Sequence, residues 1–90
     1  MRIFMQNVVL LSKIARGLYE CCKKEKISKV NSMSVIVNKR SCINSNNLFE
    51  YLKNYNENLI DICTEIKIEI EDLPDETAII RNIEGDLIKG

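Results

Sequence analysis

The residue types that carry out most protein chemistry are scarce in this chain. None of its 90 residues is histidine, so the most common general base and the most common metal ligand are both missing. Serine–histidine and cysteine–histidine catalytic pairs are excluded for the same reason. Because no nucleophile–base pair of this kind can be built, we expect a protein that binds a partner and is not an enzyme.

The four cysteines do not have the spacing of a zinc site or of a disulfide framework. No C-x-x-C pair occurs, and the adjacent Cys21 and Cys22 need distant partners to complete a tetrahedral site. A redox-active or metal-responsive pair is one interpretation of these two residues, but a helix C-terminus disfavours a thiolate. We therefore expect a buried Cys22 beside an edge Cys21. Cys42 and Cys63 could approach each other in the fold, but the favoured expectation is that both are small apolar fillers.

Three groups of charged residues each allow a chemical and a structural interpretation. One face of an expected strand carries Glu65, Lys67 and Glu69. Because charged residues alternate with apolar ones there, a solvated charge ladder is favoured over an acid–base group. Four carboxylates around Pro74 lack the regular spacing of a calcium loop, so we expect a solvated turn there; they are Glu71, Asp72, Asp75 and Glu76. A small basic patch lacks interleaved aromatic residues, which favours a solvated helix end over a phosphate or acidic-partner site; it comprises Lys23, Lys24, Lys26 and Lys29.

Composition and charge narrow the class of protein. Thirteen basic residues balance thirteen acidic ones, so no overall field would attract nucleic acid or an anionic membrane. An apolar fraction of 46% and a charged fraction of 29% are ordinary for a globular protein, and the length predicts a single domain over residues 1–90. The apolar N-terminal run is interrupted by polar residues, so neither a signal peptide nor a membrane span is expected. Without a signal peptide, the cysteines are expected to remain reduced thiols, which predicts a cytoplasmic location.

Two amphipathic helices are predicted to position these residues. The first runs from about Asn7, as the N-cap, to Glu25, with an apolar stripe of Val8, Leu10, Leu11, Ile14, Ala15, Leu18 and Cys22. Gly17 is unfavourable inside a helix unless it lets a neighbouring element approach closely. The second helix runs from about Asn47 to Tyr55, with Asn47 and Glu50 as a capping box. Its apolar stripe is Leu48, Tyr51, Leu52, Tyr55 and Leu59.

Strands are predicted where apolar residues alternate with polar ones. The clearest strand covers 64–70, where Ile66, Ile68 and Ile70 share one face and Ile62 extends the same phase. A strand over 29–38 places Met33, Val35 and Val37 on one face and Val30, Ser32, Ser34 and Ile36 on the other. Apolar residues on both faces predict an interior strand, and a polar loop over 39–47, anchored by Ile43, follows it.

The last strand is predicted over 77–83, with Ile79 and Ile83 on one face and Ala78 and Ile80 on the other. A turn at 84–86 and a short strand at Leu87 and Ile88 would end the chain. The element order is then α-β-α-β-β. The predicted fold class is α/β, in the α+β two-layer form, with two helices packed on one face of a small mixed three-stranded sheet.

With these elements placed, the chain resembles the HypA/HybF family of hydrogenase nickel-incorporation proteins from about Met5 to Pro74. Members begin Met-His-Glu before a helix, and here Met5, Gln6 and Asn7 stand in that place. Further matches follow at family spacing: Lys29 and Val30 leading into Met33, Val35 and Val37; Ser41, Cys42 and Ile43; Leu48 and Phe49; and the strand from Glu65 to Glu71. The resemblance implies the fold of the family's nickel-binding domain.

Two departures bear on metal binding. The family binds nickel through the N-terminal histidine and main-chain nitrogens, but Met5, Gln6 and Asn7 offer amides after four extra residues, and amides are poor nickel ligands. The family also inserts a zinc domain after the isoleucine-rich strand, whereas Leu73 and Pro74 lead directly into the last strands. The resemblance therefore implies degraded metal sites and no bound cofactor. Nickel is expected only if the family function is retained, and zinc is not expected.

The resemblance implies a divergent protein related to hydrogenase and metallocentre maturation that acts through protein contacts. Its partner would be a protein, with a maturation GTPase or a hydrogenase precursor as candidates, and a homodimer is a further possibility. The alternative is a small cytoplasmic α/β interaction or regulatory module, unrelated to nickel, that self-associates through an exposed sheet edge.

Overall fold

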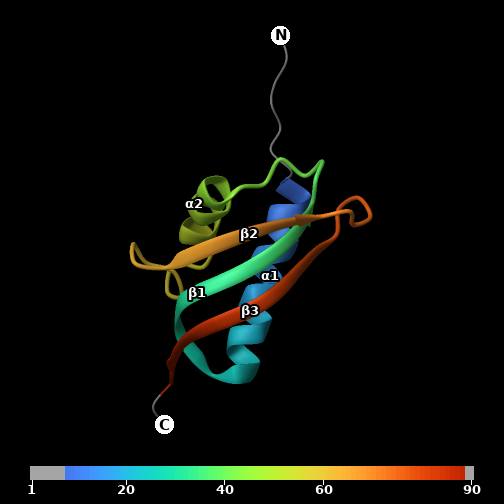
Figure 1. Ribbon diagram of the computed structural model, residues 1–90. Helices are drawn as coiled ribbons and strands as arrows, with labels where there is room; N and C mark the ends of the chain where they lie inside the picture. Colours follow the sequence, from blue (N-terminus) through green and yellow to red (C-terminus); the bar gives the residue numbers. More distant parts are fainter. Residues whose placement is uncertain (1–7, 89–90) are drawn as a thin grey trace.

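The computed structural model describes residues 8–88 of the chain, and its element order agrees with the predicted one (Figure 1). The elements are α1 (Val8–Glu25), β1 (Ile27–Asn38), α2 (Ser45–Tyr55), β2 (Glu65–Glu71) and β3 (Ala78–Leu87). The predicted α-β-α-β-β order and the α+β class are confirmed. Asn7, predicted as the first N-cap, lies outside the described residues. Neither helix in the described range is long and apolar enough to cross a membrane.

The three strands form one mixed sheet in the order β2-β1-β3. β1 is central, parallel to β2 and antiparallel to β3. Because parallel neighbours need a crossover connection, the chain passes through α2 between β1 and β2. Both helices lie on the same face of the sheet (Figure 1). The prediction of an interior strand over 29–38 and of two helices on one sheet face is confirmed.

The core lies between the helices and the sheet. It combines the buried stripe of α1, the inward face of β1 and two leucines of α2, together with Ile43 and Ile60: Leu10, Leu11, Ile14, Ala15, Leu18, Cys22, Ile27, Val30, Met33, Val35, Val37, Leu48 and Leu52. Val8 was predicted in the α1 stripe but is half exposed. Gly17 does allow a close approach, because a Cβ there would lie 3.3 Å from Cδ1 of Ile80 in β3.

β1 is longer and less regular than its sequence pattern predicts. It begins at Ile27 instead of Lys29. Val30 was predicted on the face opposite Met33, but both are fully buried in the core. The β1–β3 register shifts between Val30 and Ser32, and such a bulge breaks the alternation of side chains. Val30 also bonds to the α2–β2 loop, since its N–H donates to the carbonyl of Leu59 at 2.8 Å.

β3 is one continuous strand, so the predicted turn at 84–86 and the separate final strand are wrong. Gly85 pairs with Val30 inside the ladder. A further register shift, between Ser34 and Val35, makes Arg81 the extra residue of a bulge. Beyond this bulge the phase changes, so Ile83 packs on the core with Ile80. It had been predicted to share a face with Ile79, which is 45% exposed.

α2 starts earlier than predicted and has a different cap. Asn44 is the N-cap, and its side chain accepts a hydrogen bond from the N–H of Asn47 at 2.8 Å. The Asn47 side chain accepts from the N–H of Asn44 at 3.0 Å, which completes a capping box. The predicted box of Asn47 and Glu50 is therefore wrong. Tyr55, predicted in the apolar stripe, is 68% exposed.

β2 lies at the edge of the sheet, so its isoleucine face is covered only in part. Ile66 and Ile68 are half-buried against the core, whereas Ile70 is 61% exposed. Ile62 does not continue the strand, because it lies in the preceding loop and is 83% exposed. The isoleucine pattern identified the strand correctly but not how much of it is buried.

The face of the sheet away from the helices is polar, with one buried exception. Ile36 is only 8% exposed although it lies on this face between Glu69 of β2 and Ile79 of β3. Arg81 reaches from β3 to Glu69, with 2.6 Å between Nη1 and Oε1. This ion pair spans β1 beside Ile36. The predicted solvated ladder of Glu65, Lys67 and Glu69 is thus exposed at its first two residues and bridged at the third.

Candidate functional site

The positions that the resemblance assigns to nickel, Met5, Gln6 and Asn7, lie outside the described residues. Between residues 8 and 88, no group of three or more histidine, cysteine or carboxylate residues is arranged to hold a metal ion. A candidate functional site must therefore be built from the other surfaces of the described chain.

The carboxylate-rich turn between β2 and β3 is held by polar contacts to other elements. Asn38, at the end of β1, donates through Nδ2 to the carbonyl of Pro74 at 3.1 Å and to Oδ1 of Asp75 at 3.4 Å. Lys13 of α1 donates to the carbonyl of Glu76 at 3.2 Å. These contacts fix the turn against β1 and α1, in agreement with its interpretation as a solvated structural turn.

Of the four cysteines, Cys22 is buried, Cys21 is partly exposed, and Cys42 and Cys63 are exposed. Cys22 is 2% exposed, and burial raises the pKa of its thiol to about 11, with a further contribution from the neighbouring Cys21. Such a thiol stays protonated and unreactive near neutral pH. Cys42 and Cys63 are both exposed, so their prediction as core fillers is wrong. Cys42 lies in the loop before α2, with φ of 60°, and Cys63 lies in the turn before β2.

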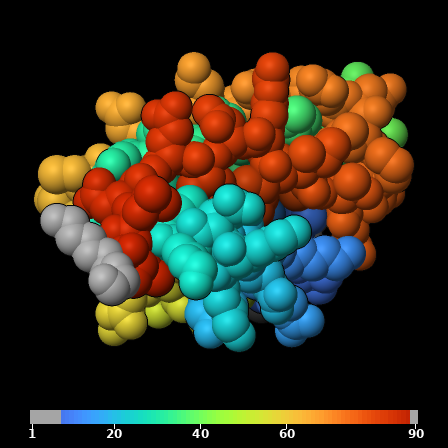
Figure 2. All heavy atoms as spheres, turned by 90° about the horizontal axis from the view of Figure 1, so that it is seen from below, coloured from blue at the N-terminus to red at the C-terminus, as the bar shows by residue number. Residues whose placement is uncertain are grey.

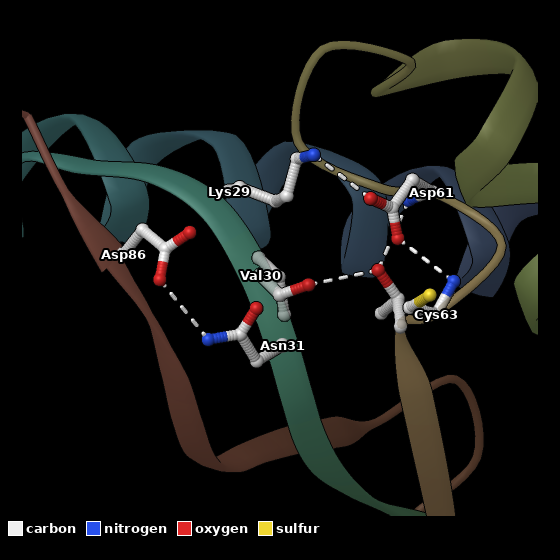
Figure 3. Close-up of polar contacts among 7 residues, drawn as sticks. Lys29, Val30, Asn31, Asp61, Cys63 and Asp86 are labelled. Carbon is white, nitrogen blue, oxygen red and sulfur yellow. Dashed lines mark hydrogen bonds and ion pairs between the residues drawn. The ribbon is translucent and has the colours of Figure 1, made fainter.

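Lys29, predicted within a basic patch, instead belongs to a polar network that fastens the α2–β2 loop to β1 (Figure 3). Its ammonium lies 2.8 Å from Oδ2 of Asp61. This hydrogen bond raises the pKa of Lys29 and lowers that of Asp61. Oδ1 of Asp61 accepts from the N–H of Cys63 at 2.8 Å. The Asp61 carboxylate thus links the loop's own turn to the strand.

Thr64 completes this network at a buried position. Its hydroxyl donates to the carbonyl of Val30 at 2.8 Å and accepts from the N–H of Asp61 at 3.0 Å. On the other side of β1, Asn31 donates to Asp86 of β3 at 3.3 Å (Figure 3). Lys29, Asp61 and Thr64 all take part in contacts between the loop and β1, so we assign the network to fold stability and not to chemistry.

The most distinctive surface is an apolar hollow of about 350 Å³ at the C-terminal end of α1. Four parts of the chain meet there: the end of α1, the start of β1, the end of α2 with the residues after it, and the end of β3 with the residue after it. Figure 2 views the molecule from this end and shows the junction of α1 and β1 in cyan, the segment around the end of α2 in yellow and the end of β3 in red. The apolar wall consists of Tyr19, Ile27, Tyr55, Leu59 and Ile88, with Lys23 and Glu57 among the other lining residues.

Large apolar side chains remain exposed around this hollow. Tyr19 is 54% exposed, Tyr55 68% and Ile88 54%. Tyrosine side chains combine a large contact area with a polar end, and they are enriched in protein interfaces. The hollow therefore has the chemistry of a protein-contact site, with one cation and one carboxylate among its lining residues.

Asn56 forms the floor between the hollow and the core. It is 7% exposed, and its side-chain amide donates to the carbonyl of Ala15 in α1 at 3.4 Å. Its own carbonyl accepts from the N–H of Leu59 at 2.8 Å. Within the described residues, its side-chain oxygen has no hydrogen-bond partner. Asn56 thus ties the segment after α2 to α1 and positions Tyr55 and Leu59.

Sequence reasoning did not identify this hollow. The sequence predicts Tyr55 and Leu59 in the apolar stripe of the second helix, which does not indicate an exposed site. A usable signal was the position of Tyr55 at the last residue of a helix, where a side chain easily extends past the core.

Comparisons with known proteins concern the fold. No protein-family model and no curated protein sequence matches the chain. Among solved structures, the chain is similar to the solution structure of the Ni metallochaperone HypA from Helicobacter pylori, with 19% sequence identity and a TM-score of 0.51. The match covers 74% of this chain and 58% of that chain.

At this identity, the similarity shows a HypA-like fold. The chain spans less than two thirds of the length of the Helicobacter pylori protein, so the activity of that whole protein is not transferred with the fold. The resemblance drawn from the spacing of residues is thereby confirmed at the level of architecture.

Proposed function

We propose that this chain is a HypA-like protein that takes part in metallocentre maturation by contacting another protein. It binds no nickel tightly through Met5, Gln6 and Asn7, contains no zinc and catalyses no reaction. The HypA-like fold and the similarity to a Ni metallochaperone support the maturation role. The exposed apolar hollow supports a role in binding.

The single observation that carries the proposal is the exposure of Tyr19, Tyr55 and Ile88 around one hollow. Aromatic anchors of this kind supply most of the binding energy in typical interfaces. The hollow is of a size that can accept a few side chains of a partner. Lys23 and Glu57, among the lining residues, would fix the orientation of a docked segment by charge.

The partner class that fits best is a protein of the maturation apparatus, with a maturation GTPase or a hydrogenase precursor as candidates. The proposal places the protein in the cytoplasm. Free thiols at Cys21, Cys22, Cys42 and Cys63 support a reducing compartment.

Calorimetric titration of the purified chain against a purified maturation GTPase tests the contact. We expect Tyr55→Ser to weaken binding by about tenfold or more, because truncating an aromatic anchor typically removes about 2 kcal/mol or more. Val9→Ser is the matched control, since Val9 is 51% exposed and does not line the hollow. Equal binding by both variants, or no binding by the unmodified chain, would contradict the proposal.

Titration of the same chain with nickel tests the statement about metal. We expect no stoichiometric tight binding, because the amides of Gln6 and Asn7 replace the ligands of the family. Stoichiometric tight binding would contradict the statement, and if it survived Gln6→Ala, the ligands would not include the Gln6 side chain.

A further inference from the structure

The two edges of the sheet differ in regularity. β1 and β2 pair through seven consecutive residues, from Ser32 with Glu65 to Asn38 with Glu71, without a register shift. The β1–β3 ladder contains three shifts, one of which places its extra residue, Arg81, in the edge strand β3 itself. Bulges of this kind protect a sheet edge from pairing with another chain. Among the described strands, β2 is therefore the edge with the regular geometry that accepts a further strand.

The sequence of β2 is complementary to itself in the antiparallel direction. When a second copy of the strand is placed opposite with Ile68 facing Ile68, Ile66 faces Ile70 and Lys67 faces Glu69. The pairs Ile66–Ile70 and Lys67–Glu69 each occur twice, and the pair of Ile68 residues lies on the two-fold axis. Directly opposed residues of an antiparallel pair point to the same face of the sheet. The isoleucines of both copies would thus share the helix side, and the charged residues would share the other side.

We propose that two copies of this chain associate through antiparallel β2–β2 pairing centred on Ile68, which joins two three-stranded sheets into one of six strands. The interface uses none of the residues that line the hollow, so this proposal does not rest on the proposed function. A two-fold axis perpendicular to the sheet relates the copies, and all four helices lie on one face.

The registers on either side are less favourable. Centring the pair on Lys67 would set lysine against lysine and Glu65 against Glu69. Centring it on Glu69 would set glutamate against glutamate and match fewer isoleucines. In the proposed register, Glu65 faces Glu71, but this pair lies at the two ends of the strands, where water and salt screen the charges.

The exposed apolar surface of β2 also agrees with this partner. Ile70 is 61% exposed in one copy, and in the proposed pair it faces the half-buried Ile66 of the second copy. Matched isoleucines across strands stabilise a sheet through direct side-chain contact. The backbone groups on the outer edge of β2 would gain partners at the same time.

Sedimentation velocity of the full chain, from about 1 μM to about 500 μM, tests the proposal. We expect a concentration-dependent dimer. In a dimer of Lys67→Glu, a glutamate faces Glu69 at two places, and in a dimer of Glu69→Lys, two lysines face each other at two places. Each variant alone should therefore dimerise at least about tenfold more weakly. An equimolar mixture restores opposite charges at both places and should restore the dimer. Rescue by the mixture also shows that both variants are folded.

Glu20→Lys and Lys24→Glu are the matched controls, because both residues are exposed on α1 and the substitutions change the net charge equally. Each control should dimerise like the unmodified chain. A monomer at the highest concentration would overturn the proposal. It would also be overturned if the β2 variants left the dimer unchanged, or if the two control variants showed the same loss and rescue.

Cross-linking tests the register. In a background of Cys42→Ser and Cys63→Ser, Ile68→Cys should form a disulfide-linked dimer on mild oxidation, because Ile68 meets itself at the axis. Ile70→Cys alone should not, since its opposite residue is Ile66. A mixture of Ile66→Cys and Ile70→Cys should cross-link. Efficient cross-linking of Ile70→Cys alone would contradict the proposed register.

Discussion

Gly85 and Gly17 both lie where two elements approach closely, but the atoms that they face differ. A Cβ at Gly85 would lie 2.1 Å from the backbone carbonyl oxygen of Lys29, which cannot move without displacing β1. A Cβ at Gly17 would lie 3.3 Å from the terminal methyl of Ile80, which can rotate away. One glycine is therefore required by the ladder, and the other is tolerated in the helix.

We expect Gly85→Ala to lower the free energy of unfolding by about 3 kcal/mol, the upper end of the usual overpacking range. Gly17→Ala should leave it unchanged or raise it by up to about 1 kcal/mol, because alanine favours the helix. Urea denaturation followed by far-UV circular dichroism measures both. Equal stability of the two variants would mean that β1 and β3 separate more easily at Gly85 than the structure indicates.

The buried thiol of Cys22 makes stability depend on alkaline pH. Its pKa is about 11 in the folded chain against 9.0 for an unperturbed thiol. The contribution is fully present below pH 9, and it is lost as the pH rises towards 11, because the unfolded chain releases this proton first. We expect the free energy of unfolding to fall by about 2 kcal/mol more in the unmodified chain than in Cys22→Ala over that interval. Parallel slopes for both chains would contradict this prediction.

At the scale of elements, the sequence predicted each helix and strand. It did not predict which residues of the strands face the core or which residue caps α2, because bulges and capping contacts decide these details. Alternation of apolar residues identifies a strand only while the register is continuous. Val30 precedes one register shift, and Ile83 follows the bulge at Arg81. For that reason, both lie on the faces opposite to those predicted. The asparagines before α2 offer several caps of the same chemistry, and in the structure Asn44 is the N-cap and Asn47 completes the capping box.

The α2–β2 loop has no regular secondary structure. Beside Val30, it makes the hydrogen bonds to β1 that a neighbouring strand would otherwise make. Thr64 provides its buried anchor, with a donor to Val30 and an acceptor for Asp61. We expect Thr64→Val to lower the free energy of unfolding by about 1–3 kcal/mol, because it leaves both backbone groups without a partner. Thr64→Ser keeps the hydroxyl and should restore most of the loss in a thermal or urea melt. A serine variant as unstable as the valine variant would assign the effect to the methyl group.

At the scale of the whole molecule, both helices and all three strands contribute to one apolar cluster. Since residues 8–88 contain one such cluster, this part of the chain should unfold as one unit. We expect urea unfolding curves from far-UV circular dichroism and from tyrosine fluorescence to coincide, with a slope of about 1–2 kcal/mol per molar urea for a chain of this size. Separated midpoints would indicate that α2 and its loop unfold independently.

The candidate site could not be derived from the sequence because it exists only in the assembled molecule. Its lining residues come from the junction of α1 and β1, the end of α2 with the segment after it, and the end of β3, which are distant along the chain. Each segment alone has the pattern of an ordinary helix, loop or strand. The resemblance directed attention to Met5, Gln6 and Asn7, whereas the described structure offers its exposed aromatic surface at the other end of α1.

The position of β1 in the chain has a consequence for synthesis on the ribosome. β1 is the central strand, yet both of its neighbours are translated after it, since β2 begins at Glu65 and β3 at Ala78. The β2 residues that pair with Val35 and Val37 lie 33 positions later in the chain. At about 5–20 residues per second, these valines emerge about two to seven seconds before β2 can cover one side of their strand. During that interval α1 can shield one face only. Newly made chains should therefore depend on helper proteins, or on rapid helix docking, more than the small size of the finished molecule implies.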